Sequence, residues 1–197
     1  LINNNLLPKK YGWSIDNIHP GLDMIILGMH AKKDNPELLE AQKQNILINS
    51  FPEFIFNYSK HKKRIVISGS HGKTTITGMV IHVLNELKIK SDYVVGAKID
   101  LLHNQVRLNN HDVIIIEGDE YFSSAIDSSP KFMHYKPDIL VVSGVAWDHV
   151  NVYPTLFSYE KSFERIINQV KNNSGKIFYC DHDSFLSSYL NNNSLIH

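Results

Sequence analysis

A glycine-rich segment that carries a lysine and two threonines has the residue types needed to bind phosphate. It reads Gly69-Ser70-His71-Gly72-Lys73-Thr74-Thr75. Glycines let successive backbone N–H groups turn into one concavity, and a helix that starts there adds the positive end of its dipole. We expect Lys73 to supply a mobile cation to the outer phosphates of a nucleotide, and the Thr74 hydroxyl to bind Mg²⁺.

The residues on either side supply the context that a phosphate loop requires. Residues 64–68 form a β-branched run typical of a strand buried on both faces of a parallel sheet. After Lys73, apolar residues spaced three and four apart predict one stripe of a helix. The members of that stripe are Ile76, Met79, Val80, Val83, Leu84 and Leu87. The loop is two residues shorter than the general Walker A motif, which has a glycine where this chain has Ile67, so a glycine turn with a chance Lys-Thr pair stays an alternative.

Two further predicted strands end in acidic or imidazole groups. Residues 113–116 run directly into Glu117-Gly118-Asp119-Glu120-Tyr121, and residues 139–142 lead to Trp147-Asp148-His149. The carboxyl ends of parallel strands meet at one edge of a sheet, which is where ligands bind in open α/β folds. The phosphate loop follows a strand of the same sheet, so we expect these three segments to converge.

The acidic segment predicts a magnesium site. Three carboxylates within four residues repel one another unless a cation lies among them, and the Mg²⁺ carried by ATP is the natural candidate. We expect Glu117 to be the first ligand and His149 to complete a second metal site or to contact the γ-phosphate. A solvated acidic turn and a histidine that only caps a loop are the alternatives. For Asp119 and Glu120 a capping role stays open.

Composition excludes several classes of protein. The 20 basic and 20 acidic side chains cancel, so no basic surplus indicates a nucleic-acid partner, and we interpret Lys62-Lys63-Arg64 as a solvated strand entrance. Cys180 is the only cysteine, which excludes an intrachain disulfide and a cysteine zinc cluster. No apolar run approaches the roughly 20 residues that span a bilayer. We therefore expect a cytoplasmic protein without membrane insertion, and, since the chain lacks an initiator Met, a fragment.

The rest of the chain predicts alternating strands and helices. Before the phosphate loop, Asn35 and Pro36 mark the start of a helix, because asparagine caps helices and proline suits the first position. The predicted strands are residues 22–27, 46–48, 93–95 and 176–180, and the predicted helices are residues 35–44, 52–59, 156–170 and 184–190. This alternation favours a small α/β layer, then a boundary near His61, then a second α/β unit.

The three motifs together resemble the Mur ligase family, ATP-dependent enzymes that join an amino acid or peptide to a UDP-linked muramyl carboxylate. The family loop Gly-Ser/Thr-x-Gly-Lys-Thr-Thr is similar to residues 69–75, its acidic strand end to residues 117–120, and its Asp-His to Asp148-His149. The helix start Asp34-Asn35-Pro36-Glu37 also resembles the UDP-binding domain of this family. The resemblance covers residues 21 to about 180.

The resemblance implies a division of the chain and a set of roles. Residues 1–62 would be the C-terminal part of a partial Rossmann-like, UDP-binding domain, and residues 63–197 an incomplete ATP-binding central domain with a P-loop and a mainly parallel sheet; the C-terminal ligase domain would be absent. ATP and Mg²⁺ are the implied cofactors. Lys73 would stabilise the transferring phosphoryl group, Thr74 and Glu117 would hold one Mg²⁺, and His149 would help to hold a second.

Within the family, Tyr121 and the run Pro130-Lys131-Phe132-Met133-His134-Tyr135-Lys136-Pro137 resemble the peptidoglycan-recycling branch. That branch joins the tripeptide L-Ala-γ-D-Glu-meso-diaminopimelate, a muropeptide, to UDP-N-acetylmuramate through an acyl phosphate. The alternative is the branch that adds L-alanine, which usually has serine at the position of Tyr121. Glu164 stands where several family members carry a carbamylated lysine, and both branches resemble this chain in lacking it. We expect the glycine-rich uridine-binding start and the C-terminal domain of the family to be missing from this chain, so a nucleotide-binding fragment without ligase activity is one further alternative. Another is a phosphate-loop enzyme of a different family, such as folylpolyglutamate synthase, which would use the same loop on a different acceptor.

Overall fold

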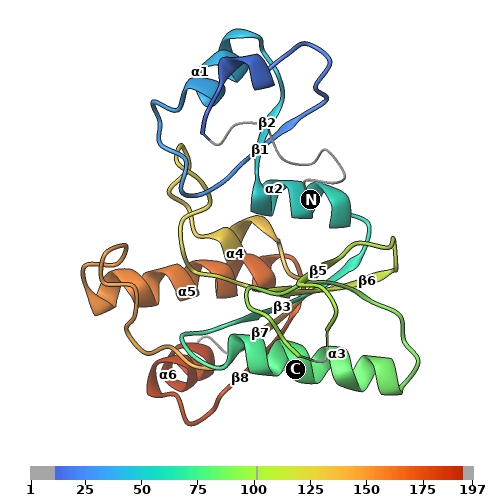
Figure 1. Cartoon of the computed structure of the whole chain (residues 1–197). Helices are drawn as coiled ribbons and strands as arrows, with labels where there is room; N and C mark the ends of the chain where they lie inside the picture. Colours follow the sequence, from blue (N-terminus) through green and yellow to red (C-terminus); the bar gives the residue numbers. More distant parts are fainter. Residues whose placement is uncertain (1–11, 101, 193–197) are drawn as a thin grey trace.

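The computed structural model describes residues 12–100 and 102–192, which form a central sheet with helices on both faces and a smaller layer beside it (Figure 1). The central strands are β3 (Lys63–Ser68), β4 (Asp92–Val94), β5 (Val106–Arg107), β6 (Val113–Glu117), β7 (Ile139–Val142) and β8 (Lys176–Tyr179). Their order is β5-β4-β6-β3-β7-β8, and every neighbouring pair is parallel except β4 with β5. The predicted α/β fold with a mainly parallel sheet is confirmed.

Helices cover both faces of this sheet. α3 (Lys73–Glu86) lies on one face, whereas α2 (Phe51–Ser59), α4 (Lys131–His134) and α5 (Leu156–Asn172) lie on the other (Figure 1). α6 (Ser184–Asn192) follows β8. Strand β6 is a continuous apolar run because both of its faces are buried. Ile114 and Ile116 belong to the core on the α5 side, and Ile115 belongs to the core on the α3 side.

The strand register aligns three carboxyl ends. Ile67 of β3 pairs with Glu117 of β6, and Ser68 of β3 pairs with Val142 of β7. The phosphate loop, the acidic segment and residues 143–149 therefore leave the sheet at one edge, as expected from a parallel sheet.

The smaller layer precedes β3. Its strands β1 (Ile25–Leu27) and β2 (Ile48–Ser50) pair in parallel, with α1 (Pro36–Lys43) between them and the short 3₁₀ helix η2 (Ile15–Asn17) before them. Asn35 caps α1 as predicted, because its side chain accepts hydrogen bonds from the N–H groups of Glu37 and Leu38.

Several predicted elements differ from the structure. Strand β1 is shorter than the predicted residues 22–27, and β2 begins at Ile48, two positions after the predicted start at residue 46. Strand β5 and helix α4 were not predicted, because elements of two and four residues carry too little periodicity to be recognised.

One interpretation of exposure was wrong. Lys62 is buried rather than solvated, because its ammonium lies within hydrogen-bonding distance of Asn110 and of the carbonyl of His111. The helix predicted after Lys73 is confirmed as α3, and Ile76, Val80 and Leu84 of its apolar stripe pack against the core, whereas the other members of the stripe are exposed. Within the described residues, no helix combines the length and the apolar character that crossing a bilayer requires.

Candidate active site

The phosphate loop connects β3 to α3 and requires glycine at two positions. Gly69 has φ +124° and Gly72 has φ +78°, values that other residues rarely adopt. A Cβ atom on Gly69 would lie 2.2 Å from the hydroxyl of Ser143 and 2.9 Å from the carbonyl oxygen of Gly144. The chain that follows β7 thus packs directly against the backbone of the loop.

Hydrogen bonds from the segment after β7 hold the loop in place. The Ser70 hydroxyl donates to the carbonyl of Ala146 (2.6 Å) and accepts from the Ala146 N–H (2.8 Å). The Ser143 hydroxyl donates to the carbonyl of His71 (2.5 Å), and the Ser70 N–H donates to the carbonyl of Gly144 (3.0 Å). These hydrogen bonds with residues 143–146 hold the loop in a fixed shape around its concavity.

Lys73 is the first residue of α3, and its ammonium group lies at the centre of the site. It donates to the carbonyl of Gly69 at 2.7 Å and forms an ion pair with Glu120 at 3.1 Å. The Lys73 side chain is 15% exposed, whereas that of Glu120 is 0% exposed. The cation is thus partly open to solvent and is backed by a buried anion.

Glu117 lies at the end of β6, next to the start of α3. Its carboxylate accepts a hydrogen bond from the Thr74 hydroxyl at 2.8 Å and another from the N–H of Gly96 at 3.0 Å. A carboxylate and a hydroxyl from neighbouring elements supply the hard oxygen ligands that Mg²⁺ prefers, so this pair fits the ion.

His149 approaches from the segment after β7. Its Nε2 lies 3.2 Å from the carboxylate of Glu120, and its ring contacts Tyr121 edge-on at 5.3 Å between centroids. The backbone of His149 has φ +53°, and its N–H donates to the side chain of Asp148 at 2.6 Å. This local hydrogen bond supports an unusual backbone conformation that turns the imidazole towards the phosphate loop.

A second group of side chains whose atoms could hold a metal ion includes Glu120 and His149. One ligand atom each from Asp119, Glu120 and His149 lies within 4.8 Å of the others. Burial acts to raise the pKa of Asp119, but the hydrogen bond and the charge of Lys131 outweigh it and hold that pKa below its usual value. Asp119 is therefore an anion at neutral pH, and Lys131 already neutralises it at 2.7 Å.

The structure brings the side chains of Lys73, Thr74, Glu117 and His149 to one edge of the sheet, whereas those of His71 and Thr75 point to solvent. The ligands and roles assigned to these residues stay predictions. Tyr159 was not predicted to belong to the site, although its hydroxyl donates a hydrogen bond to Glu120 at 3.0 Å. Its position on the apolar stripe of a helix indicated only a core residue.

Two buried tyrosines act as hydrogen-bond donors behind the site. The Tyr153 hydroxyl donates to the carbonyl of Glu120 at 2.5 Å. Burial, together with the nearby charge of Glu120, raises the pKa of Tyr153 to about 12 and raises that of Tyr159 further. Both hydroxyls therefore stay protonated over the physiological range.

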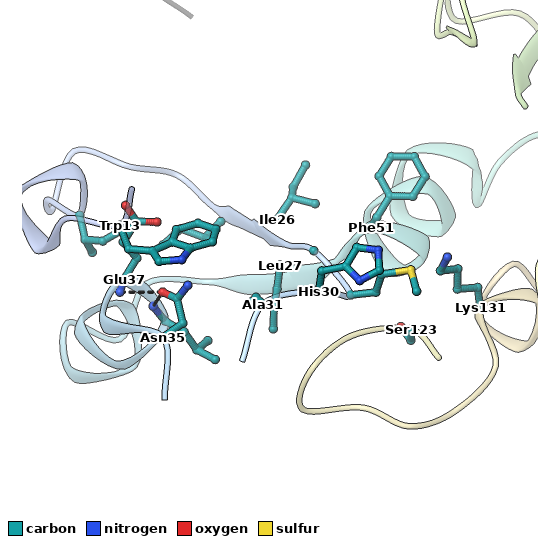
Figure 2. A pocket seen from close by; sticks show the side chains of 15 residues that line it. Trp13, Ile26, Leu27, His30, Ala31, Asn35, Glu37, Phe51, Ser123 and Lys131 are labelled. Atoms are coloured by element: carbon teal, nitrogen blue, oxygen red, sulfur yellow. Dashed lines mark hydrogen bonds between the residues drawn. The ribbon is translucent and has the colours of Figure 1, made fainter. Parts of the chain in front are cut away.

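A pocket of about 570 Å³ lies between the smaller layer and the chain after β6. Figure 2 shows Trp13 at one end of the pocket and Lys131 at the other, with Leu27 and His30 between them. Most of the lining is apolar, with a few polar groups, which is the usual make-up of a small-molecule site. Through its ion pair with Asp119, Lys131 connects this pocket to the phosphate-loop edge.

Comparison with known proteins identifies relatives of most of the chain. The profile described as the Mur ligase middle domain matches residues 67–195. The UDP-N-acetylmuramate–L-alanyl-γ-D-glutamyl-meso-2,6-diaminoheptandioate ligase of Haemophilus influenzae is 30% identical over 159 residues, which cover 80% of this chain and 35% of the relative. The UDP-N-acetylmuramate–L-alanine ligase of Clostridium botulinum (strain Langeland) is 32% identical over 158 residues, covering 80% and 33%. The chain thus spans about a third of the length of these relatives.

Solved structures support the same fold. A UDP-N-acetylmuramate:L-alanyl-γ-D-glutamyl-meso-diaminopimelate ligase from Neisseria meningitides superposes with a TM-score of 0.80 at 23% identity, over 90% of this chain and 57% of that one. The UDP-N-acetylmuramate–alanine ligase of Thermotoga maritima gives 0.72 at 24% identity, over 95% and 41%. Both the smaller layer and the central sheet take part in these superpositions, since 90% or more of the chain is covered.

Proposed function

The chain belongs to the Mur ligase family, and on that premise we propose that it is the ATP-binding part of an amide-bond-forming peptidoglycan ligase. One observation carries the proposal: Lys73, the Glu117–Thr74 pair and His149 come from three distant segments and gather around one glycine loop. This arrangement has a cation for the outer phosphates, oxygen ligands for Mg²⁺ and a helix N-terminus for the triphosphate.

The proposed reaction is acyl activation followed by transfer. The muramyl carboxylate attacks the γ-phosphate of ATP, which forms an acyl phosphate and releases ADP. The incoming amine then attacks the acyl carbonyl, expels inorganic phosphate and loses a proton as the amide bond forms. Lys73 neutralises charge on the transferring phosphoryl group, and the backbone N–H groups of residues 69–75 orient the triphosphate. Thr74 and Glu117 would hold one Mg²⁺ and His149 a second; the metal supplies charge neutralisation at the phosphate oxygens.

For the amine we propose a muropeptide, with L-alanine as the second candidate. The supporting feature is the run of residues 130–137, whose Lys131 forms an ion pair with Asp119, next to Glu120. We assign UDP-N-acetylmuramate to the pocket of Figure 2, because that pocket joins the smaller layer to the phosphate-loop edge. We also propose that residues 1–62 belong to the UDP-binding domain and residues 63–197 to the ATP-binding domain.

The test is a phosphate-release assay on the purified complete gene product that carries this chain. It receives Mg-ATP and UDP-N-acetylmuramate, with the tripeptide L-Ala-γ-D-Glu-meso-diaminopimelate in one sample and free L-alanine in another. We expect phosphate release that depends on the tripeptide and a new UDP-linked product by mass spectrometry. Turnover with L-alanine alone would move the assignment to the alanine-adding branch.

Two controls make the assay decisive. A sample without UDP-N-acetylmuramate measures any ATPase activity that is independent of the acceptor carboxylate. A Glu117→Gln variant should lose tripeptide-dependent release, because it loses a charged oxygen ligand for the metal. Absence of release with both amines, in a protein that binds Mg-ATP, would contradict the ligase assignment.

A further inference from the structure

Glu120 is a buried carboxylate that meets groups from three other segments. Its side chain is 0% exposed. Its oxygens lie 3.1 and 3.2 Å from the ammonium of Lys73, 3.2 Å from Nε2 of His149 and 3.0 Å from the hydroxyl of Tyr159. These partners come from α3, from the segment after β7 and from α5. Glu120 is therefore the point at which the three segments are tied together.

The environment of Glu120 stabilises its charge. A buried carboxylate is tolerated only when donors replace the lost water, and here Lys73 and Tyr159 supply them. Tyr159 is a dependable donor because its hydroxyl stays protonated, and the same hydroxyl lies 2.9 Å from Ser70 Oγ in the phosphate loop. The carboxylate is thereby held at a fixed place relative to the loop.

Glu117 and Glu120 differ in what surrounds them. Glu117 is half-buried and bonded to a hydroxyl and one backbone N–H, which leaves room for a metal ion. Oε1 of Glu120 lies within 3.2 Å of three groups, and Oε2 lies 3.1 Å from Lys73. A metal ion at Glu120 would have to displace the ammonium that the phosphates need.

We infer that Glu120 is a positioning residue, which fixes the ammonium of Lys73 against the phosphate loop and ties it to His149. The inference deepens the proposed function and rests on it for what Lys73 then contacts. Lysine has a flexible four-carbon side chain, so a free ammonium would have to be ordered each time a nucleotide binds. With Gly69 and Glu120 as two anchors, Lys73 is ordered before the nucleotide arrives.

The first experiment measures the position of Lys73 directly, without nucleotide. The 197-residue chain and its Glu120→Gln variant are acetylated with an N-hydroxysuccinimide ester, and each lysine is followed by peptide mass spectrometry. We expect Lys73 to react about tenfold faster in the variant, because one charge-assisted hydrogen bond is lost. Lys62 is the internal control: it is buried at the other edge of the sheet, so its rate rises only if the protein unfolds.

In the matched control, the acetylation rate of Lys62 should change and that of Lys73 should not. Asp92→Asn removes the carboxylate that faces Lys62, so it should raise the rate of Lys62 and leave that of Lys73 unchanged. If Glu120→Gln does not fold, Tyr159→Phe removes one donor to the same carboxylate and should raise the Lys73 rate about threefold. An unchanged Lys73 rate in a folded variant would overturn the inference.

A second measurement separates positioning from metal binding. In Mg²⁺ titrations of ATP binding, we expect Glu120→Gln to raise the midpoint by only about twofold, because Glu120 contacts His149 without being a ligand itself. Glu117→Gln should raise the same midpoint about tenfold. A rise in Glu120→Gln as large as that in Glu117→Gln would make Glu120 a metal ligand and overturn the inference. Failure of the native chain to bind Mg-ATP would count against the proposed function, and the acetylation result would still decide the role of Glu120.

Discussion

The carboxyl and amino edges of the central sheet each carry a buried cluster of the same kind: a lysine, a carboxylate, a tyrosine and a histidine. At the carboxyl edge these are Lys73, Glu120, Tyr159 and His149, and at the amino edge they are Lys62, Asp92, Tyr58 and His111. In both clusters the carboxylate is 0% exposed. Residue types alone therefore do not distinguish a binding site from a structural cluster.

The amino-edge cluster is closed. The Lys62 ammonium has three acceptors, namely Asp92 at 3.3 Å, Asn110 at 3.2 Å and the His111 carbonyl at 2.6 Å. Burial acts to raise the pKa of Asp92, but hydrogen bonds from the Asn109 N–H, Tyr58 and Lys62 outweigh it and lower that pKa. The Lys62 ammonium and both carboxylate oxygens of Asp92 thus have partners among the described residues, which leaves neither charge free to bind a ligand.

The carboxyl-edge cluster is open on one side. Within residues 12–100 and 102–192, the Lys73 ammonium has acceptors from two residues only, Gly69 and Glu120. Its side chain is 15% exposed, against 6% for Lys62, and it lies beneath a loop that glycines keep narrow. The two edges differ because the Lys73 side chain is more exposed than that of Lys62 and lies next to the phosphate loop. We therefore expect variants at the amino edge to change stability and variants at the carboxyl edge to change nucleotide binding.

The largest expected effect is on stability, at the amino edge. Asp92→Asn leaves the Lys62 ammonium buried without its carboxylate, so we expect the free energy of unfolding to fall by about 3 kcal/mol. Urea denaturation followed by circular dichroism measures it. The affinity for Mg-ATP should not change. As a control, Glu164→Gln, which removes the partner of exposed Lys161, should stay within about 0.5 kcal/mol of the native protein. If Asp92→Asn lost ATP binding but kept its stability, the cluster at the amino edge would not be structural.

At the carboxyl edge the effect should fall on binding. Lys73→Ala removes the cation that faces the outer phosphates, and we expect Mg-ATP affinity to fall about hundredfold or more. Isothermal titration calorimetry measures the affinity, and a thermal melt checks that the fold persists. Lys161→Ala, on the outer face of α5, is the matched control and should bind ATP as the native chain does. Unchanged affinity in Lys73→Ala would contradict the assignment of the loop.

The Thr74 hydroxyl should contribute to Mg²⁺ binding at the carboxyl edge. Thr74→Val keeps the side-chain shape but removes the oxygen that donates to Glu117, and we expect the Mg²⁺ midpoint for ATP binding to rise about tenfold. Thr77→Val on the same helix is the control, because the Thr77 hydroxyl is buried and has no hydrogen-bond partner in the described part of the chain. Equal midpoints in both variants would place the metal elsewhere.

The smallest expected effect is a pH dependence at the amino edge. The pKa of Asp92 is lower in the folded state than in the unfolded chain, so its stabilisation is complete above about pH 4 and is lost as the pH falls through the lowered pKa. Between pH 5 and 3 we expect the native protein to lose about 1 kcal/mol more stability than Asp92→Asn does. Urea titrations at each pH measure this, and parallel losses in the two proteins would show that Asp92 does not contribute.

The sequence predicted the carboxyl edge far better than the amino edge. The phosphate loop, the acidic strand end and Asp148-His149 are local motifs, and parallel strands are known to bring their ends together. Lys62 was interpreted as solvated because its partners lie 30 to 49 positions further along the chain. No local pattern encodes such a contact.

Glu120 shows the same limit within the site. Its position among acidic residues indicated a ligand or a cap, and only the packing of α5 against the acidic segment reveals that Tyr159 and Lys73 enclose it. Strand β5 and helix α4 were missed for a different reason, because such short elements are stabilised by their neighbours and not by their own periodicity.

The most direct test of the binding edge is an NMR titration of the ¹⁵N-labelled 197-residue chain with Mg-ATP. We predict that amide shifts concentrate in residues 69–75, in Glu117 and Glu120, and in His149, while Lys62 and Asp92 at the opposite edge stay unchanged. Shifts centred on Lys62 and Asp92, or no shifts at millimolar Mg-ATP, would contradict the account.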